Sequence, residues 1–188
     1  MTTSHIEAVP GYMAGAWTVD PVHSEVGFSA RHMMVSKVRG KFTTFEGRIV
    51  TGTNVTDSSV TGTVDLTSID TGNSDRDDHI RSADFFDVAA SRTMTFVSTS
   101  VRANGDDYLV VGDLTLKGVT RSVTFDLEVG GFGPDAYGGT RCGFTATTTI
   151  NRRDYGVDFS AVMETGGMVV GDKITVELEI EAVLDGPD

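Results

Sequence analysis

His23 is the first side chain that invites a chemical interpretation, because an imidazole changes charge near neutral pH. It lies between Asp20 and Ser24, and these three residue types are those of a catalytic triad. A triad is defined by geometry, however, and three neighbours on one turn rarely align as nucleophile, base and orienting acid. We therefore interpret the segment as a turn after the first strand, with His23 bonded to the backbone.

His32 is the second histidine of interest. It has the same parity as Val26, Phe28 and Ala30, so it points inward if this strand stays regular. An inward histidine either orients the polar head of a ligand or is a core residue whose hydrogen bonds a neighbour satisfies. The sequence leaves both interpretations open.

A charged cluster at residues 75–81 contains the side chains of a metal site. Asp77, Asp78 and His79 are consecutive, so they do not share one face of a helix. Asp75 and His79 are spaced four apart, but two ligands make a weak site. A capped helix carrying salt bridges is the alternative, and we expect that structural role here.

The segment NRRDYG, residues 151–156, follows a strand directly. Arg152 and Arg153 beside Asp154 and Tyr155 could receive a carboxylate or a phosphate. They could equally lock a corner of the fold through an arginine–aspartate pair. The sequence contains no phosphate-binding loop, metal-ligand motif or nucleophile elbow.

The elements that position these residues are strands. From residue 173 to residue 184 apolar and polar residues alternate without a break. Because side chains on a strand alternate between faces, this segment belongs to a sheet with one apolar side. Further strands are predicted at residues 26–30, 41–50, 60–66, 93–102, 108–116, 119–129 and 141–150, with a bulge where Phe42 and Phe45 break parity.

The predicted fold class is all-β, an extended antiparallel lipocalin-like β-barrel of about eight strands. Tight turns at Asn104–Gly105 and Lys117–Gly118 favour up-and-down order. Residues 33–37 are interpreted as a helical turn and residues 130–139 as a long loop. One short helix is expected near residues 74–86, capped by Ser74 or Asn73, as a lid over one end. We expect residues 1–14 to form a flexible arm and residues 15–185 a single barrel domain.

Composition narrows the possible partners. The formal net charge is −12 in 188 residues, which argues against nucleic acid or an anionic membrane surface as the main partner. Cys142 is the single cysteine, so an intrachain disulfide is impossible. The sequence shows no signal peptide and no apolar run long enough for a membrane helix. We therefore expect a cytoplasmic protein, or a secreted one if this chain is a processed form.

Several segments, taken in order, resemble the YceI-like family. The opening WTVDPVHSEVGF at residues 17–28 resembles the first signature of that family, and GKFTTFEG at residues 40–47 resembles the second. Further similar segments lie at residues 68–72, 76–80, 82–87, 112–120 and 151–156. The resemblance implies a lipocalin-like barrel that binds a polyisoprenoid chain, often as a dimer, without catalytic residues.

The first functional hypothesis is a non-catalytic carrier. Its barrel interior holds a long isoprenoid chain, which belongs to a polyprenyl or quinone-like compound. We expect no catalytic cofactor and no metal. We expect a bound polyisoprenoid-type lipid and a possible homodimer. The small residues Gly62, Gly112, Gly143 and Ala146 would leave room inside. The candidate ligand-binding residues are Phe28, His32, Phe42, Phe45, Met94, Phe96, Leu114, Phe125, Phe144 and Ile150.

Two alternatives remain open at this point. One is an enzyme acting on a small hydrophobic substrate, with His32 or His23 as acid–base and Arg153 or Asp154 assisting. The other is an acidic, stress-related barrel filled with its own side chains. The filled barrel predicts no cavity and no ligand, and the enzyme predicts turnover with a pH dependence near the histidine range.

Overall fold

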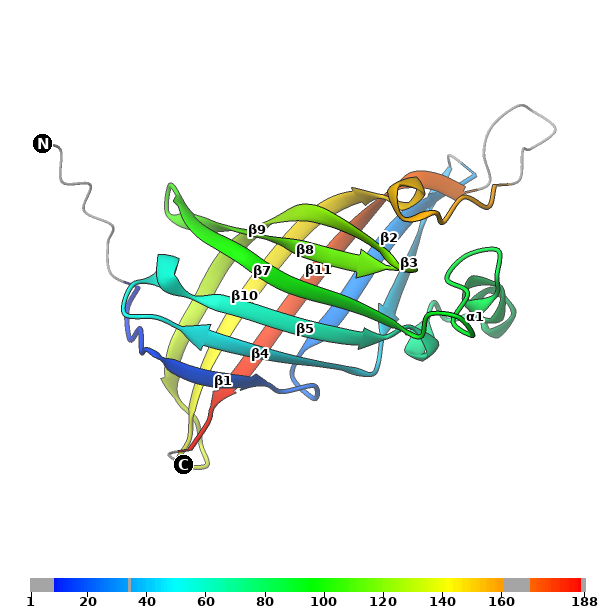
Figure 1. Cartoon of the computed structure of the whole chain (residues 1–188). Coiled ribbons are helices and arrows are strands. Elements are labelled where there is room, and N and C mark those ends of the chain that lie inside the picture. The colour runs from blue at the N-terminus through cyan, green and yellow to red at the C-terminus, as the bar shows by residue number, and fades with distance from the viewer. Residues whose placement is uncertain (1–8, 34, 161–169, 187–188) are drawn as a thin grey trace, which may run out of the picture.

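Eight strands close into an antiparallel β-barrel in the computed structural model, which describes residues 9–33, 35–160 and 170–186 (Figure 1). Each strand pairs with the next, and β1 pairs with β11 to close the ring. The barrel strands are β1 (Gly15–Val19), β4 (Phe45–Thr51), β5 (Ser59–Asp65), β7 (Thr93–Asn104), β8 (Asp107–Leu116), β9 (Val119–Pro134), β10 (Thr140–Asn151) and β11 (Val170–Leu184). The predicted all-β barrel is therefore confirmed.

Three further strands extend the sheet beyond one end of the barrel: β2 (Glu25–His32), β3 (Ser36–Phe42) and β6 (Ile69–Asp70). They can do so because β11 changes partner along its length. It pairs with β1 near Ala182 and with β2 from Glu179 to Val170. The turn between β1 and β2 is where the chain passes from the ring to the extension.

The parity break at Phe42 and Phe45 is a strand switch, so the predicted bulged strand at residues 41–50 is wrong. β3 ends at Phe42 and β4 begins at Phe45. Between them, the amides of Thr43 and Thr44 donate to the carbonyl and the hydroxyl of Ser68, at 3.2 and 3.0 Å. These bonds with a distant segment redirect the chain, which local sequence cannot show.

Two predicted irregular segments belong to the sheet instead. The Val35 amide donates to the His32 carbonyl at 3.1 Å, and β3 starts at Ser36, directly paired with His32. The helical turn expected at residues 33–37 is therefore wrong. β9 continues to Pro134, so the loop expected at residues 130–139 shrinks to a turn, held by the Asp135 carboxylate and the amides of Tyr137 and Gly139.

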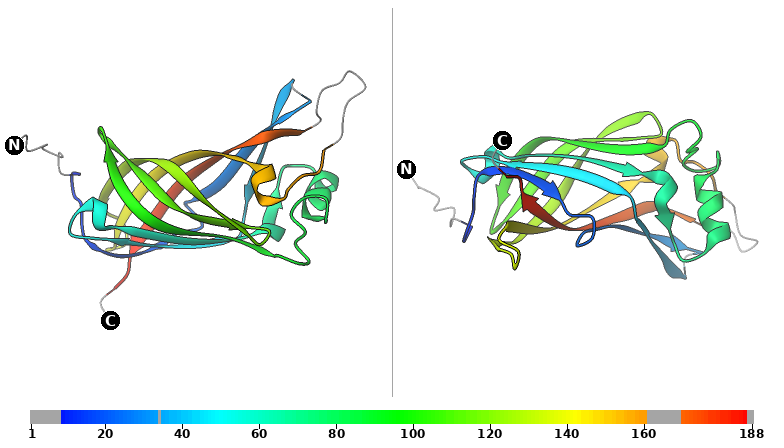
Figure 2. Two further views of the ribbon diagram at one scale, coloured as in Figure 1. Left: turned by 45° about the horizontal axis from the view of Figure 1, so that its top comes forward. Right: turned by 90° about the horizontal axis from the view of Figure 1, so that it is seen from below.

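The expected helix is α1 (Ser74–Arg81), shorter than predicted and capped by Asn73, whose side chain accepts from the Arg76 amide at 3.0 Å. It lies beside the end of the barrel from which β2 and β3 extend (Figures 1 and 2). Three short 3-10 turns lie among the described residues: η1 (Val55–Asp57), η2 (Leu66–Ser68) and η3 (Arg152–Tyr155). None of the described helices has the length and apolarity needed to span a membrane.

Buried apolar side chains gather at both ends of the barrel. At the α1 end, Leu66, Ile69 and Phe85 pack with Tyr155 and Val157. At the opposite end the core contains Trp17, Val19, Ile49, Cys142 and Ala182. Trp17 is fully buried, and its Nε1 donates to Thr51 Oγ1 at 2.9 Å. The middle of the barrel lies between these two clusters.

Candidate functional site

The middle of the barrel contains a cavity of about 210 Å³. One enclosed water needs roughly 10–15 Å³, so this space is far more than a packing defect. The side chains around it come from all eight barrel strands. Apolar members include Val19, Ile49, Val60, Val64, Val101, Val110, Leu127, Val129, Phe132, Val176, Leu178 and Ile180.

Seven of the ten predicted ligand-binding residues line this cavity: Phe45, Met94, Phe96, Leu114, Phe125, Phe144 and Ile150. The other three lie outside its lining. Phe28 and Phe42 stack at 5.5 Å in the core near α1, and His32 is at the end of β2, paired with Ser36. Phe28 and His32 lie on β2 and Phe42 lies on β3, and both strands belong to the extension of the sheet, so inward parity does not bring these three residues to the cavity.

The small residues differ in what they leave open. A Cβ atom at Gly62 would have the Glu46 carbonyl oxygen, at 3.7 Å, as its single neighbour, and both Gly62 and Ala146 line the cavity. Gly112 is different, because a Cβ there would lie 2.4 Å from the Phe96 ring. Free space therefore lies beside Gly62 and Ala146, while at Gly112 a phenyl ring fills it.

The described lining contains no histidine, cysteine, lysine or arginine. Glu46 borders the cavity, but its side chain is exposed on the outer face of β4. Tyr12 also lines the cavity, and its hydroxyl donates to the Gly52 carbonyl at 2.7 Å. Such a surface mainly offers contact area to an apolar chain.

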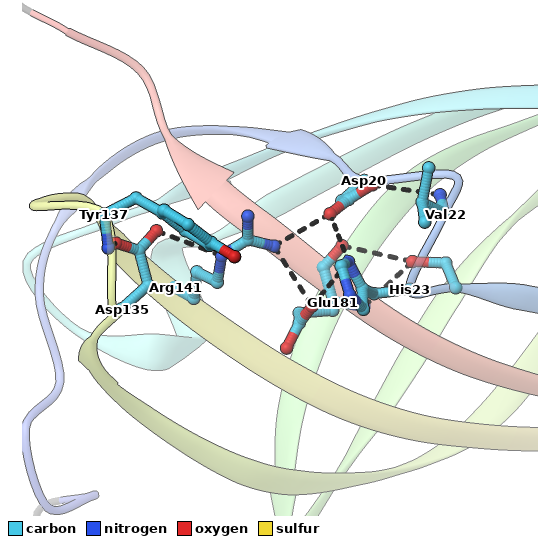
Figure 3. A network of polar contacts seen from close by, with 8 residues as sticks. Asp20, Val22, His23, Asp135, Tyr137, Arg141 and Glu181 are labelled. Carbon is cyan, nitrogen blue, oxygen red and sulfur yellow. Dashed lines mark hydrogen bonds and ion pairs between the residues drawn. The ribbon is translucent and has the colours of Figure 1, made fainter.

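His23 belongs to a polar network outside the cavity (Figure 3). Its Nδ1 lies 2.7 Å from Asp20 Oδ2, so it contacts a carboxylate and not the backbone as predicted. The other oxygen of Asp20 accepts from the Val22 amide at 2.9 Å, which is the expected turn. Ser24 bonds with the backbone of Glu181, so it does not complete a triad with His23.

Arg141 is the centre of this network. Its guanidinium donates to Asp20 at 2.8 Å and to both Asp135 and Glu181 at 3.1 Å. The hydrogen bond from Arg141, followed by that from His23, holds the pKa of Asp20 well below its usual range. Asp20, His23 and Glu181 stand close enough together to share a metal ion. The Arg141 guanidinium already bonds with the carboxylates of Asp20 and Glu181. We therefore interpret the cluster as a structural network that links neighbouring strands.

The charged cluster near α1 also has structural partners. Asp77 is buried and accepts from the amide and the hydroxyl of Thr71, at 3.0 and 2.5 Å. His79 Nε2 lies 2.8 Å from Asp84, and Arg81 pairs with Asp78. These bonds support the interpretation as a capped, salt-bridged helix.

Arg152 and Arg153 hold the corner where β10 meets β11. Arg152 is 4% exposed, and its Nη1 donates to the carbonyls of Val157 and Phe159, each at 2.7 Å. Arg153 pairs with Asp172 at 2.8 Å. Both arginines therefore have structural partners at this corner, as the second interpretation of the motif predicts. The structure places His23 and Arg153 in separate networks, so it does not bring these two candidate residues together.

Sequence reasoning missed several lining residues for identifiable reasons. Phe132 was assigned to a loop, and Val9 and Tyr12 to a flexible arm. Tyr12 instead donates to the Gly52 carbonyl at 2.7 Å and packs against Phe132 at 5.2 Å. Residues 1–8 of that arm lie outside the described residues. Phe132 is three residues after Val129, so simple alternation places it on the outer face; the register shift between β9 and β10 at Gly143 and Phe144 is what brings it to the interior.

Comparison with known proteins agrees with this architecture. The YceI-like domain model matches residues 17–182. The chain belongs to the YceI-like family. A UPF0312 protein of Staphylococcus epidermidis is 40% identical over 168 residues, covering 88% of this chain and 96% of that protein. A UPF0312 protein of Staphylococcus aureus is 38% identical, with 88% and 95% covered.

Two solved structures have the same fold. BcnA of Burkholderia cenocepacia superposes with a TM-score of 0.76 at 25% identity, covering 87% of this chain and 98% of BcnA. A polyisoprenoid-binding domain of Saccharophagus degradans, implicated in plant cell wall breakdown, superposes with a TM-score of 0.69 at 18% identity, covering 92% and 100%. At these identities the likeness establishes the barrel.

Proposed function

We propose that this protein binds a long apolar isoprenoid chain inside the barrel and carries it without chemical change. The observation that supports this most is the cavity of about 210 Å³, surrounded by apolar side chains of all eight barrel strands. Burial of apolar surface contributes about 25 cal/mol per Å², so a flexible hydrocarbon gains most from such a space. The polyisoprenoid-binding domain with the same fold supports the choice of an isoprenoid.

The alternative enzyme has no comparable support. The described lining contains no histidine, and His23, which bonds with Asp20, is not part of it. A barrel filled by its own side chains is disfavoured by the cavity itself.

Chain-length dependence tests the proposal directly. Geraniol, farnesol and geranylgeraniol differ by one isoprene unit each and are titrated into the ligand-free protein by calorimetry. Affinity should rise by about tenfold or more per unit, because each buried CH₂ is worth roughly 0.8 kcal/mol. The heat capacity of binding should become more negative with length. Absence of binding, or affinity independent of length, would contradict the proposal.

A further inference from the structure

Basic side chains gather on the outer face of the sheet where β2 and β3 extend it beyond the barrel. They come from three neighbouring strands, β11, β2 and β3, and each of them is exposed. Residues of the opposite parity on these strands, such as the paired Phe28 and Val176, pack in the interior, so the basic side chains point outward. The five residues, which we call the basic face, are Arg31, Lys37, Arg39, Lys41 and Lys173.

The cations of the basic face repel one another. Arg31 lies directly opposite Lys37, and like charges in that position destabilise a sheet. Among the described residues, no ion pair includes a member of the basic face. Two carboxylates share the row of Lys41: Asp70, directly opposite it, and Glu177, two strands away. The face therefore keeps an excess of positive charge from which the fold itself gains nothing.

Protection of a free sheet edge explains only part of this charge. β3 pairs with β6 over its last two residues, so the rest of its outer edge is unpaired among the described residues. Basic side chains on such an edge discourage pairing with another chain, and Lys37 and Arg39 meet that need. Arg31 and Lys173 belong to β2 and β11, which have neighbouring strands on both sides. Their charge requires another explanation.

Exposed apolar side chains lie next to the basic face, at the end of the extension (Figures 1 and 2). Val35 is 84% exposed and Met33 is 42% exposed, and both lie between the last residue of β2 and the first residue of β3. Met33 has a φ of 53°, in the left-handed region that glycine and asparagine usually occupy in a tight connection. We call Met33 and Val35 the apolar tip, which the protein itself leaves unburied.

Cations beside exposed apolar side chains match the surface of an anionic lipid bilayer. Lysine and arginine are attracted to its charged headgroups, and apolar side chains enter the boundary between headgroups and acyl chains. A nucleic acid would satisfy the cations and leave the apolar tip in water. A second copy of this chain in a symmetric contact would bring the same cations against one another. The lipid surface is the partner that uses both features.

We propose that the basic face and the apolar tip dock this protein on an anionic lipid surface, with Val35 entering the headgroup region. The net charge of −12 argued against such a partner, but it describes the whole chain and not this face. Charges further away than about 8 Å are largely screened at physiological salt, so the acidic remainder of the chain opposes docking only weakly. The proposal goes beyond the carrier function, because docking requires no ligand in the cavity.

Co-sedimentation with vesicles tests docking of the full-length protein. Vesicles of equal parts phosphatidylcholine and phosphatidylglycerol should bind it, vesicles of phosphatidylcholine alone should not, and added salt should release it. Each cation near such a surface contributes about fivefold to binding, so a variant with Lys37→Gln, Arg39→Gln and Lys173→Gln should bind about a hundredfold more weakly. No binding to the anionic vesicles, or equal binding by wild type and variant, would overturn the proposal.

Arginine at a distance from the face provides the matched control. Arg102 is exposed on β7, outside the basic face, so Arg102→Gln should bind vesicles as the wild type does, whereas Arg39→Gln should lose about fivefold. Equal losses in these two variants would show that net charge alone matters and would overturn the face. The triple variant should still take up geranylgeraniol in solution, so failure of docking and failure of the carrier function are distinguishable.

Tryptophan fluorescence tests which part of the protein meets the lipid. Val35→Trp and Val22→Trp place a reporter at two valines, 84% and 83% exposed, beyond opposite ends of β2, and the native Trp17 is fully buried. Brominated acyl chains in the anionic vesicles should quench Val35→Trp and not Val22→Trp. Quenching of Val22→Trp, or of neither, would overturn the proposal. Duplex DNA that binds as tightly as the vesicles would point to a nucleic acid site and overturn it too.

Discussion

Gly62 is the residue at which the cavity can be filled with least disturbance. It lies on β5 between Val60 and Val64, and a Cβ there would meet a carbonyl oxygen at 3.7 Å and no other atom within 4 Å. We predict that Gly62→Leu reduces isoprenoid uptake about tenfold or more, a loss of at least 1.4 kcal/mol. Filling a cavity commonly stabilises a fold, so the melting temperature should stay constant or rise.

Uptake by this variant is measured by titration with geranylgeraniol. Ser100→Leu adds the same side chain at an exposed position of β7 outside the lining and is the control, which should bind as the wild type does. Unchanged binding by a folded Gly62→Leu protein would show that the ligand lies elsewhere.

Cys142 reports on the integrity of the core at the Trp17 end. It is 2% exposed, and burial raises its pKa to about 12, so the thiol is neutral in the folded protein. The unfolded thiol ionises near pH 8.5, and its reactivity depends on the thiolate. We predict that a disulfide reagent at pH 8 modifies Cys142 only as fast as the protein unfolds. Rapid, complete modification of the native protein would contradict this packing.

Residue positions inside the ring were largely predictable, and those near its end were not. Alternation placed Phe96, Leu114 and Phe125 correctly on the interior face, because parity is a local property of a strand. It failed for Phe28 and Phe42, because their strands leave the ring after a turn or a switch. Whether the seven lining residues bind a ligand stays a prediction.

At the scale of elements, the Arg141 network ties the β1–β2 turn to β10, β11 and the turn after β9. Arg141→Gln removes its bonds with Asp20, Asp135 and Glu181 and should lower the melting temperature at pH 7. The pKa of Asp20 is lowered mainly by the Arg141 hydrogen bond, and that of Asp135 mainly by the Gly139 and Tyr137 amides. Carboxylates with lowered pKa stabilise the fold above the unfolded pKa, near 3.9, and this stability is lost as the pH falls.

The difference in melting temperature between wild type and Arg141→Gln should therefore shrink from pH 7 to pH 3. Arg48→Gln is a useful control, because Arg48 forms one exposed pair with Asp185 and such pairs contribute little. An equal difference at both pH values would mean that the arginine acts through packing and not through these carboxylates.

The helix at the barrel end depends on one buried carboxylate. Asp77 accepts two hydrogen bonds from Thr71, which in turn bonds with Arg76. We predict that Asp77→Ala lowers the free energy of unfolding by about 2 kcal/mol, as expected for bonds with a charged group. Asp75→Ala, at an exposed position of the same turn, should have a much smaller effect.

Denaturant unfolding and hydrogen exchange measure this change. Exchange in residues 74–81 should accelerate in Asp77→Ala before exchange in β8 and β9 does. Uniform acceleration along the chain would show that α1 is not a separate unit of stability.

The points at which strands change partner or stop pairing could not be predicted from the sequence, for one common reason. The switch at Thr43–Thr44 depends on Ser68, and the end of the β9–β10 ladder at Thr147 depends on the pairing of β9 with β8 and of β10 with β11. Both are set by pairing between distant segments, which one sequence does not reveal. The helix cap at Asn73 and the turn at Lys117–Gly118, with φ of 53° and 75°, were predictable because they are local.

At the scale of the whole molecule, the barrel follows from one-sided strands joined by tight turns. Such a sheet must bury its apolar face, and closure achieves this without leaving edges. The sequence could not show that the closed interior keeps free space, since that depends on how Phe96 and its neighbours pack. The homodimer and the cytoplasmic location stay predictions, which sedimentation and cell fractionation test.

The most direct test of the account is the lipid content of the protein purified under native conditions. Solvent extraction followed by quantitative mass spectrometry should yield close to one isoprenoid lipid per chain. An extract without lipid, from a folded protein that also fails to take up added polyprenol, would contradict the carrier function and leave the family likeness as a statement about fold.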